Sequence, residues 1–591
     1  MSESHVPAMA ESKARERESR FARLFSSEVF RPREHQTLGE RARHAYRQLQ
    51  EVHRGLGSAK AIAQDLPSLF ALFEWSAMLA PELFLVLSGH FNLTLNALLS
   101  LGRGRTDLED YLRELDSGEA VGVFLLTELG YGSTVFSLET EAEYDHERRG
   151  FWLTTPRDAA LKFMPNVAAA DVPKLVVIAA RLKVAGEDQG VFPFILRLRG
   201  KDGGLHEGVR VVPQPERPLY AMDNAMIGFD RVWLSFRDWL PGDAGSISEQ
   251  GVFHSDYGKR ERFRRTIEML QTGRVALACG AVASARASLS IALSYARQRR
   301  VAVPDRGTAA MLDCWNVQHD LLVGLARIHA CTLFGRFVQD LFSQGDEERE
   351  ALSLLAMLLK PYISKSAFDV IQMCRERCGA QGMFGVNRIP EYLAGCQVTI
   401  TAEGENQVLQ LTAARRLVMG EHLRTPLEGT DATRTEGSSL FAERARRLRT
   451  RIAQGLEAPL GPGEDRFERW NAWSTEAIAL AEAQGEALAL ECLQVALRAQ
   501  APSSEGFRAA SAVLRVFVAD GLRRHAGWFQ SEGLLGAEEA RRLDVELREA
   551  CLELLPHVPR VLEAFVLPEA LREAPIAAPE GYVEAWARRF R

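Results

Sequence analysis

The sequence predicts an α+β fold with an N-terminal helical domain, a middle β-barrel domain, a helical-bundle domain and an additional C-terminal helical domain. Apolar residues recur at helical spacing between residues 28 and 115, with breaks at Pro67 and Pro81. Short runs of β-branched and aromatic residues follow, and helical spacing then returns. We place the domains at residues 1–126, 127–245, 246–423 and 424–591.

The middle region is predicted to be a small β-barrel or sandwich from about Thr127 to Asp243. Its expected strands are separated by glycine turns and are rich in residues that favour extended structure. They are Phe151–Thr154, Lys174–Leu182, Val191–Leu196 and Gly208–Val212.

Two helical regions are predicted after the β-domain. Alanine and glycine dominate one face of Ala276–Leu293, which permits the close packing of a bundle, and Leu321–Phe337 has the same period. A polar linker at 424–439 then leads to a last helical segment of the chain.

Composition excludes some classes of function. The 591 residues carry a formal charge of −6. The chain therefore lacks the excess of positive charge that nucleic-acid binding requires, and we exclude that class of function. The eight cysteines show neither a disulfide framework nor a zinc set, and we expect reduced thiols and no metal site.

The apolar segments and the two ends of the sequence predict where the protein resides. The longest apolar candidate, Leu69–Leu87, contains Glu74, Pro81 and Glu82, so no membrane span is expected. The N-terminal tail mixes acidic and basic residues, and the chain lacks a Ser-Lys-Leu ending. We therefore expect a cytoplasmic protein.

The most informative stretch runs from Cys378 to Met419. Small residues at Cys378–Gly382 let backbone N–H groups approach a charged ligand closely. Polar and apolar residues alternate loosely through Val398–Ala402, and helical spacing resumes after Glu403-Gly404-Glu405-Asn406. A carboxylate at such a helix start suits a general base. The alternative is that Glu403 or Glu405 is an ordinary capping carboxylate.

A second motif is Thr127-Glu128-Leu129-Gly130-Tyr131-Gly132-Ser133. Its N–H groups and the Thr127 hydroxyl are suited to contact a flat heteroaromatic ring or a phosphate. An equal alternative is that Gly130 and Gly132 merely end a helix.

These two motifs carry a resemblance to a known family. Arg377–Gly382 together with Glu403–Gln410 resembles the C-terminal signature of the acyl-CoA oxidase branch of the acyl-CoA dehydrogenase superfamily, and the Thr127 motif resembles the oxidases' Thr-Glu-Leu-Gly-x-Gly. The resemblance implies that Glu403 removes the α-proton of an acyl thioester while FAD accepts the β-hydride. It further implies reoxidation by oxygen with release of hydrogen peroxide, and a homodimer.

The resemblance also implies a set of cofactor contacts. Lys162–Asn166 falls where the oxidases commonly show Lys-Trp-Trp-Pro-Gly, with Phe163 and Met164 in place of the tryptophans, and Val301 stands where an Arg-Arg-Gln motif would place its glutamine. The candidate FAD contacts are Thr127, Gly132, Ser133, Phe163, Asn166, Arg299, Gln318, Gly379, Gln381, Gly382 and Glu405.

Two other functions compete with an oxidase. One is a dehydrogenase that passes electrons to a flavoprotein partner and acts on an acyl-CoA or on an acyl chain held by a carrier protein. The other is a non-catalytic descendant that keeps the helical scaffold as an interaction module. Peroxide release in air separates the oxidase from the dehydrogenase, and flavin binding separates both from the scaffold.

Overall fold

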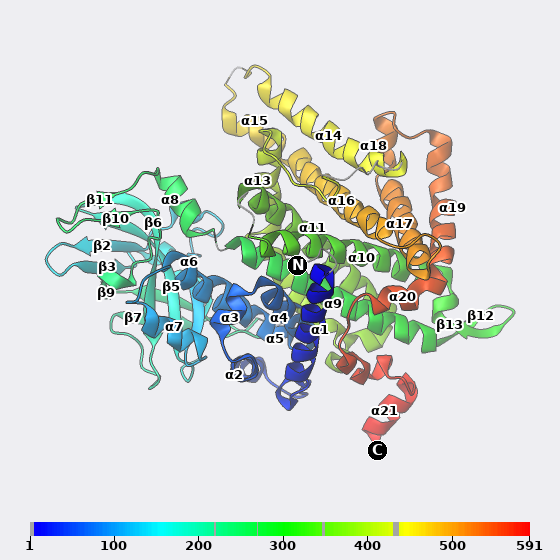
Figure 1. Cartoon of the computed structure of the whole chain (residues 1–591), viewed down its shortest axis with the longest axis horizontal. Coiled ribbons are helices and arrows are strands. Elements are labelled where there is room, and N and C mark those ends of the chain that lie inside the picture. The colour runs from blue at the N-terminus through cyan, green and yellow to red at the C-terminus, as the bar shows by residue number, and fades with distance from the viewer. Residues whose placement is uncertain (1–4, 218–219, 269, 346–348, 429–435, 462) are drawn as a thin grey trace. The chain divides into compact units, whose positions relative to one another are not determined.

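The computed structural model describes residues 5–217, 220–268, 270–345, 349–428, 436–461 and 463–591. They form two compact units (Figure 1). The first unit runs to Ser76 and from Ala80 to Ala276, and the second contains Ala77–Leu79 and continues from Leu277. Residues 77–79 group with the second unit because their carbonyl oxygens accept hydrogen bonds from Ser284, Tyr392 and Arg388.

The N-terminal region is helical, as predicted. Its helices are α1 (His5–Phe25), α2 (Leu38–Leu56), α3 (Ala59–Gln64), α4 (Leu66–Leu79), α5 (Pro81–Leu87), α6 (Asn96–Leu101) and α7 (Glu109–Asp116). Helix α2 begins at a capping box, in which the Thr37 hydroxyl accepts from the Glu40 N–H and the Glu40 carboxylate accepts from the Thr37 N–H. A π-helical segment, Ser88–Leu95, joins α5 to α6.

The predicted β-domain is confirmed, and it consists mainly of two sheets. The strands are β1 (Val121–Leu125), β2 (Glu141–Asp145), β3 (Gly150–Thr154), β4 (Lys162–Asn166), β5 (Lys174–Val184), β6 (Glu187–Arg199), β7 (Val209–Pro213), β8 (Asn224–Phe229) and β9 (Val232–Ser235), with a short β10–β11 pair at Ser246–Ile247 and Phe253–His254. One sheet has the order β1-β5-β2-β3-β9 with β6 also paired to β5, and the other has the order β4-β8-β7. Their inward-facing apolar side chains form a common core.

Strand β1 answers a question that the sequence left open. The apolar run before Thr127 is extended and pairs in parallel with β5, from Val121 opposite Lys174 to Leu125 opposite Ile178. Gly130 and Gly132 therefore follow a strand and do not end a helix. This places the Thr127 motif at the carboxyl end of β1.

Helix α8 (Lys259–Thr266) still belongs to the first unit, and the boundary between the two units falls within α9 (Leu270–Gln298). The second unit continues with the small hairpin β12–β13 (Arg300–Val303 and Gly307–Ala310). The chain continues through α10 (Trp315–Ser343), α11 (Arg349–Arg377), α12 (Ile389–Thr401) and α13 (Asn406–Val418). In Figure 1, α10 and α11 run side by side. The small side chains of α9 are buried, as its composition predicts.

The remaining elements of the second unit are again helical. They are α14 (Glu436–Glu457), α15 (Arg466–Ala472), α16 (Ser474–Arg498), α17 (Glu505–Arg524), α18 (Ala526–Ser531), α19 (Ala537–Leu554), α20 (Val558–Glu563) and α21 (Tyr582–Phe590). Glu486 of α16 is buried, and its carboxylate accepts hydrogen bonds from Arg524 (2.6 Å) and His525 (3.1 Å). This carboxylate therefore ties α16 to the end of α17.

Within the described residues, three stretches are long and apolar enough to cross a membrane, judged by length and composition alone. They are Pro81–Leu101, Leu270–Gln298 and Trp315–Ser343, and 72%, 94% and 67% of their most apolar windows are buried within the protein. The expectation that no apolar segment reaches this length was wrong, because it considered only Leu69–Leu87. Burial of these windows explains their composition as packing of a protein interior.

Candidate functional site

Glu403 lies on a tight turn between two helices of the second unit. Helix α12 ends at Thr401 and α13 begins at Asn406. Glu403 has φ 51° and Gly404 has φ 105°, both in the left-handed region. A non-glycine residue in that region costs about 1–3 kcal/mol and persists only where its surroundings hold it. The side chain is half-buried, and its Oε2 atom is shielded from solvent.

The structure separates the two carboxylates of the motif. Glu405 is the N-cap of α13, and its Oε2 accepts a hydrogen bond from the Val408 N–H at 3.1 Å. Glu405 thus has the ordinary capping role that the sequence allowed for either residue. Glu403 stands two residues earlier, outside the cap, and its role as the general base stays a prediction.

A buried lysine of α11 holds this turn and was missed by the sequence analysis. Lys360 is fully buried, and its Nζ donates to the carbonyl oxygens of Ile400 (3.1 Å) and Gly404 (2.6 Å) and to Asn406 Oδ1 (2.9 Å). Its signal in the sequence is a single charge in the apolar run Leu358-Leu359-Lys360-Pro361. A fully buried lysine is uncommon unless its ammonium is hydrogen-bonded.

The glycine turn after α11 contains Gly379 and Gly382, and the structure accounts for each glycine by a different feature. Gly379 is exposed with φ 57°, and a Cβ at this position would meet nothing within 4 Å. Gly382 is buried, and a Cβ there would lie 2.3 Å from the Arg375 carbonyl oxygen. Gly379 therefore leaves room for a ligand, whereas Gly382 is required by packing against the end of α11.

Helix α21 contacts two of the predicted cofactor residues. The Trp586 indole N–H donates to Gln381 Oε1 at 2.9 Å, and Asn387 Nδ2 donates to the same oxygen at 3.1 Å. Arg299 is exposed at the end of α9, and its guanidinium donates to the Tyr582 hydroxyl at 3.0 Å. The terminal helix thus links Arg299 to the glycine turn.

Gln318 is the remaining predicted cofactor residue of this unit. It lies in the first turn of α10 and its side chain is buried, 9% exposed. Its role in FAD binding stays a prediction.

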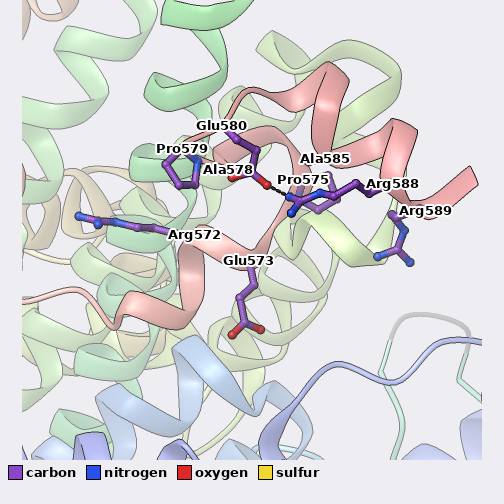
Figure 2. A pocket seen from close by; sticks show the side chains of 9 residues that line it. All are labelled: Arg572, Glu573, Pro575, Ala578, Pro579, Glu580, Ala585, Arg588 and Arg589. Atoms are coloured by element: carbon purple, nitrogen blue, oxygen red, sulfur yellow. Dashed lines mark ion pairs between the residues drawn. The ribbon is translucent and has the colours of Figure 1, made fainter. Parts of the chain in front are cut away.

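A cavity of about 530 Å³ lies in the C-terminal segment of this unit (Figure 2). Glu580 and Arg588 form an ion pair at its wall. The residues that line it are Arg572, Glu573, Pro575, Ala578, Pro579, Glu580, Ala585, Arg588 and Arg589. None of the predicted site residues is among them.

In the first unit, the Thr127 motif forms an exposed turn beside β4. Thr127, Gly132 and Ser133 are exposed, and Gly132 has φ 38° with open space where a Cβ would stand. The Thr127 carbonyl oxygen accepts a hydrogen bond from the Phe163 N–H at 3.0 Å. The fold therefore brings together Thr127 and Phe163, which the sequence placed 36 residues apart.

A buried ion pair fixes this turn. The side chains of Glu128 and Lys162 are fully buried, and Nζ lies 2.9 Å from Glu128 Oε1 and also donates to the carbonyl oxygens of Ala179 and Leu126. Glu128 further accepts from the N–H and hydroxyl of Thr140. Burial lowers the pKa of Lys162 to about 8, although the Glu128 carboxylate acts in the opposite direction.

Asn166 points into the first unit. It is 6% exposed, its side-chain amide donates to the Tyr46 hydroxyl at 3.2 Å, and its carbonyl oxygen accepts from Lys174 at 2.8 Å. Its role as a flavin contact stays a prediction. Among the described residues, no group of three or more His, Cys, Asp or Glu side chains is placed to hold a metal ion.

Family models match two parts of the chain. The model of the acyl-CoA oxidase C-alpha1 domain matches residues 268–418, which contain the glycine turn and Glu403. The acyl-CoA oxidase model matches residues 437–583. Together the two matches span about half of the chain.

Curated relatives extend over most of the sequence. The chain is 26% identical over 536 residues to acyl-coenzyme A oxidase 3, peroxisomal, of Arabidopsis thaliana, covering 84% of this chain and 77% of that protein. It is 26% identical over 491 residues to an acyl-coenzyme A oxidase-like protein of Mus musculus, covering 77% of each. The expectation of a cytoplasmic protein is contradicted here, since the Arabidopsis relative and a human one, peroxisomal acyl-coenzyme A oxidase 3, are named as peroxisomal.

Solved structures confirm the fold. Acyl-CoA oxidase 3 of Yarrowia lipolytica matches with a TM-score of 0.84 at 20% identity, covering 97% of this chain and 88% of that one. Acyl-CoA oxidase-2 of Caenorhabditis elegans, described as bound with FAD, ascaroside-CoA and ATP, matches with a TM-score of 0.85 at 19% identity, covering 98% and 90%. On the combined evidence of sequence motifs, family models and fold, the chain belongs to the acyl-CoA oxidase family.

Proposed function

We propose that this chain catalyses the FAD-dependent α,β-desaturation of an acyl-CoA, with Glu403 as the general base. The observation that carries the proposal is the place of Glu403 on a strained turn, held between α12 and α13 and distinct from the capping Glu405. A general base must be kept in position and in its charged form, and a turn fixed on both sides provides the first condition.

In the proposed reaction, the carboxylate of Glu403 takes the proton from the α-carbon of the thioester. The hydrogen on the β-carbon leaves with two electrons, so a double bond forms between the α- and β-carbons. FAD, when bound, supplies the acceptor for that hydride. Molecular oxygen is the final electron acceptor we propose, with hydrogen peroxide as its product.

Residues of both units fit a flavin by their chemistry. The first unit presents the exposed Thr127 and Ser133 hydroxyls on a turn, and these can hydrogen-bond a heteroaromatic ring. The second unit presents the open main chain at Gly379 and the exposed guanidinium of Arg299, which is suited to a pyrophosphate. We propose these four residues as flavin contacts and the homodimer as the working assembly.

We also propose the four-domain division predicted from the sequence. It places the Thr127 turn at the start of the β-domain and the glycine turn and Glu403 in the helical-bundle domain. The segment from residue 424 onward would then be the C-terminal helical domain.

The test is a visible spectrum of the purified protein, taken without oxygen before and after a panel of saturated acyl-CoAs. Bleaching of a flavin band by one thioester, followed by rapid recovery and peroxide release in air, is the expected result. Bleaching without rapid reoxidation would contradict the role of oxygen and favour a dehydrogenase. A flavin that no acyl-CoA bleaches would contradict the substrate class and direct the search to carrier-protein thioesters.

A further inference from the structure

Lys360 of α11 is placed to control the geometry of the Glu403 turn. Its side chain is fully buried, and its hydrogen-bond acceptors include the carbonyl oxygens of Ile400 and Gly404 and the side-chain oxygen of Asn406. Ile400 belongs to the last turn of α12, and Asn406 is the first residue of α13. One ammonium group therefore joins the end of one helix to the start of the next, with Glu403 between them.

A second side chain of α11 completes this attachment. Ser364 lies one helical turn after Lys360, so the two share one face of α11. Its hydroxyl accepts a hydrogen bond from Asn406 Nδ2 at 3.0 Å, and both residues are buried. The amide of Asn406 thus binds Lys360 through its oxygen and Ser364 through its nitrogen.

These contacts are matched to what the turn needs. Glu403 and Gly404 both have left-handed φ values, and such a turn relaxes unless neighbouring groups fix it. Lys360 binds main-chain and amide oxygens on either side of Glu403, so it fixes the main chain from which the Glu403 side chain projects.

We propose that Lys360 is a positioning residue for the general base Glu403, acting through the main chain of the 400–406 turn. The inference rests on the proposed function, because it assigns Glu403 as the base. It is distinct from a purely structural role, in which Lys360 only satisfies the carbonyl groups at the end of α12. A structural role lowers stability alone, whereas a positioning role lowers the rate of proton removal in protein that is folded and carries flavin.

The test compares Lys360→Met with Lys365→Met. Methionine keeps most of the length of lysine without its charge or donors. Lys365 lies on the same helix but is largely exposed and pairs with Asp369, so its substitution controls for loss of a lysine from α11. We expect Lys360→Met to lower kcat about 100-fold, the cost of a misplaced catalytic group, with KM changed less than about threefold. Lys365→Met is expected to match the wild type.

A spectroscopic readout isolates the proton-transfer step. A 3-thia-acyl-CoA has an acidic α-carbon and does not transfer hydride, and removal of its proton beside oxidised flavin gives a long-wavelength absorption band. We expect this band in the wild type and in Lys365→Met, and a much weaker band in Lys360→Met at equal flavin content. Lys360→Arg, which keeps a charged donor, is expected to recover part of the band and of kcat.

The outcomes separate the inference from the function on which it rests. A wild type that neither turns over an acyl-CoA nor gives the band contradicts the proposed function. A normal wild type with an equally strong band and equal kcat in Lys360→Met overturns the role of Lys360. Should Lys360→Met fail to yield flavin-bound protein, Asn406→Ala decides, since it removes an acceptor of the Lys360 ammonium from the far side of the turn. Asn406→Ala is expected to lower kcat several-fold, and a wild-type kcat would overturn the proposal.

Discussion

Each of the two predicted site turns is anchored by a fully buried lysine, but the two lysines bind different partners. Lys162 forms an ion pair with Glu128 in the first unit, whereas Lys360 in the second unit donates to carbonyl and amide oxygens on both sides of Glu403. The difference teaches that a buried charge can serve two purposes. The ion pair with Glu128 secures the fold around Thr127, whereas Lys360 fixes the main chain that carries a reactive side chain.

The largest expected effect is a loss of turnover, and it tests Glu403 as the proposed base. Glu403→Gln keeps the size of the side chain and removes its ability to accept a proton, so turnover is expected to fall by about 10²–10⁴-fold while flavin stays bound. Steady-state peroxide release measures the effect. Glu405→Gln is the matched control, and equal losses in both variants would contradict the assignment of Glu403 as the one base of the motif.

The anchor in the first unit should matter more for stability than for rate. Lys162→Met leaves the Glu128 carboxylate buried without its ion-pair partner, which costs about 3–5 kcal/mol in the free energy of unfolding. Urea unfolding measures the loss. Lys201→Met, at an exposed lysine of the same unit, is expected to change little. The double variant Glu128→Leu/Lys162→Met should be more stable than Lys162→Met alone, and a stable single variant would contradict the importance of the pair.

A third buried charge, the carboxylate of Glu486, is surrounded by cations and makes stability depend on pH. Burial opposes the charged form of Glu486, but His525 and Arg524 prevail and lower its pKa from 4.5 to about 2. A lowered folded-state pKa contributes stability above pH 4.5, and that contribution is lost as the pH falls toward 2. The loss is about 3 kcal/mol at most. Unfolding curves between pH 5 and pH 2 should show a flatter dependence in Glu486→Gln than in the wild type.

The smallest expected effect concerns the helix cap beside the base. Glu405→Ala removes the acceptor for the Val408 N–H, and loss of an N-cap costs about 1 kcal/mol. Thermal unfolding should detect this change, while kcat falls far less than in Glu403→Gln. A drop in kcat as large as that of Glu403→Gln would mean that Glu405 shares the catalytic role.

Much of the fold could be predicted from the sequence, because long amphipathic and apolar periods are strong signals. The exceptions have physical reasons. Val398–Thr401 is rich in β-branched residues, which favour strands, yet it is the last turn of α12. Tertiary contacts, including the hydrogen bond from Lys360 to Ile400, override that preference.

The motif residues of the candidate site could be predicted from the sequence, but the residues that support them could not. Thr127 and Glu403 stand in motifs with recognisable spacing, whereas Lys162 and Lys360 are single lysines whose partners lie 17 to 46 residues away in the sequence. No local pattern records such a contact, because it exists only after the chain folds. The resemblance to the oxidases predicts Glu403 as the base, which stays a prediction, and only the structure showed that Glu405 is the cap.

The attachment of Lys360 to main-chain oxygens has a consequence for how this sequence can change over time. The anchor binds the main-chain oxygens of residues 400 and 404, so it does not depend on the side chains of Thr401 and Ala402 between them. These two side chains can therefore be exchanged while the proposed base keeps its place.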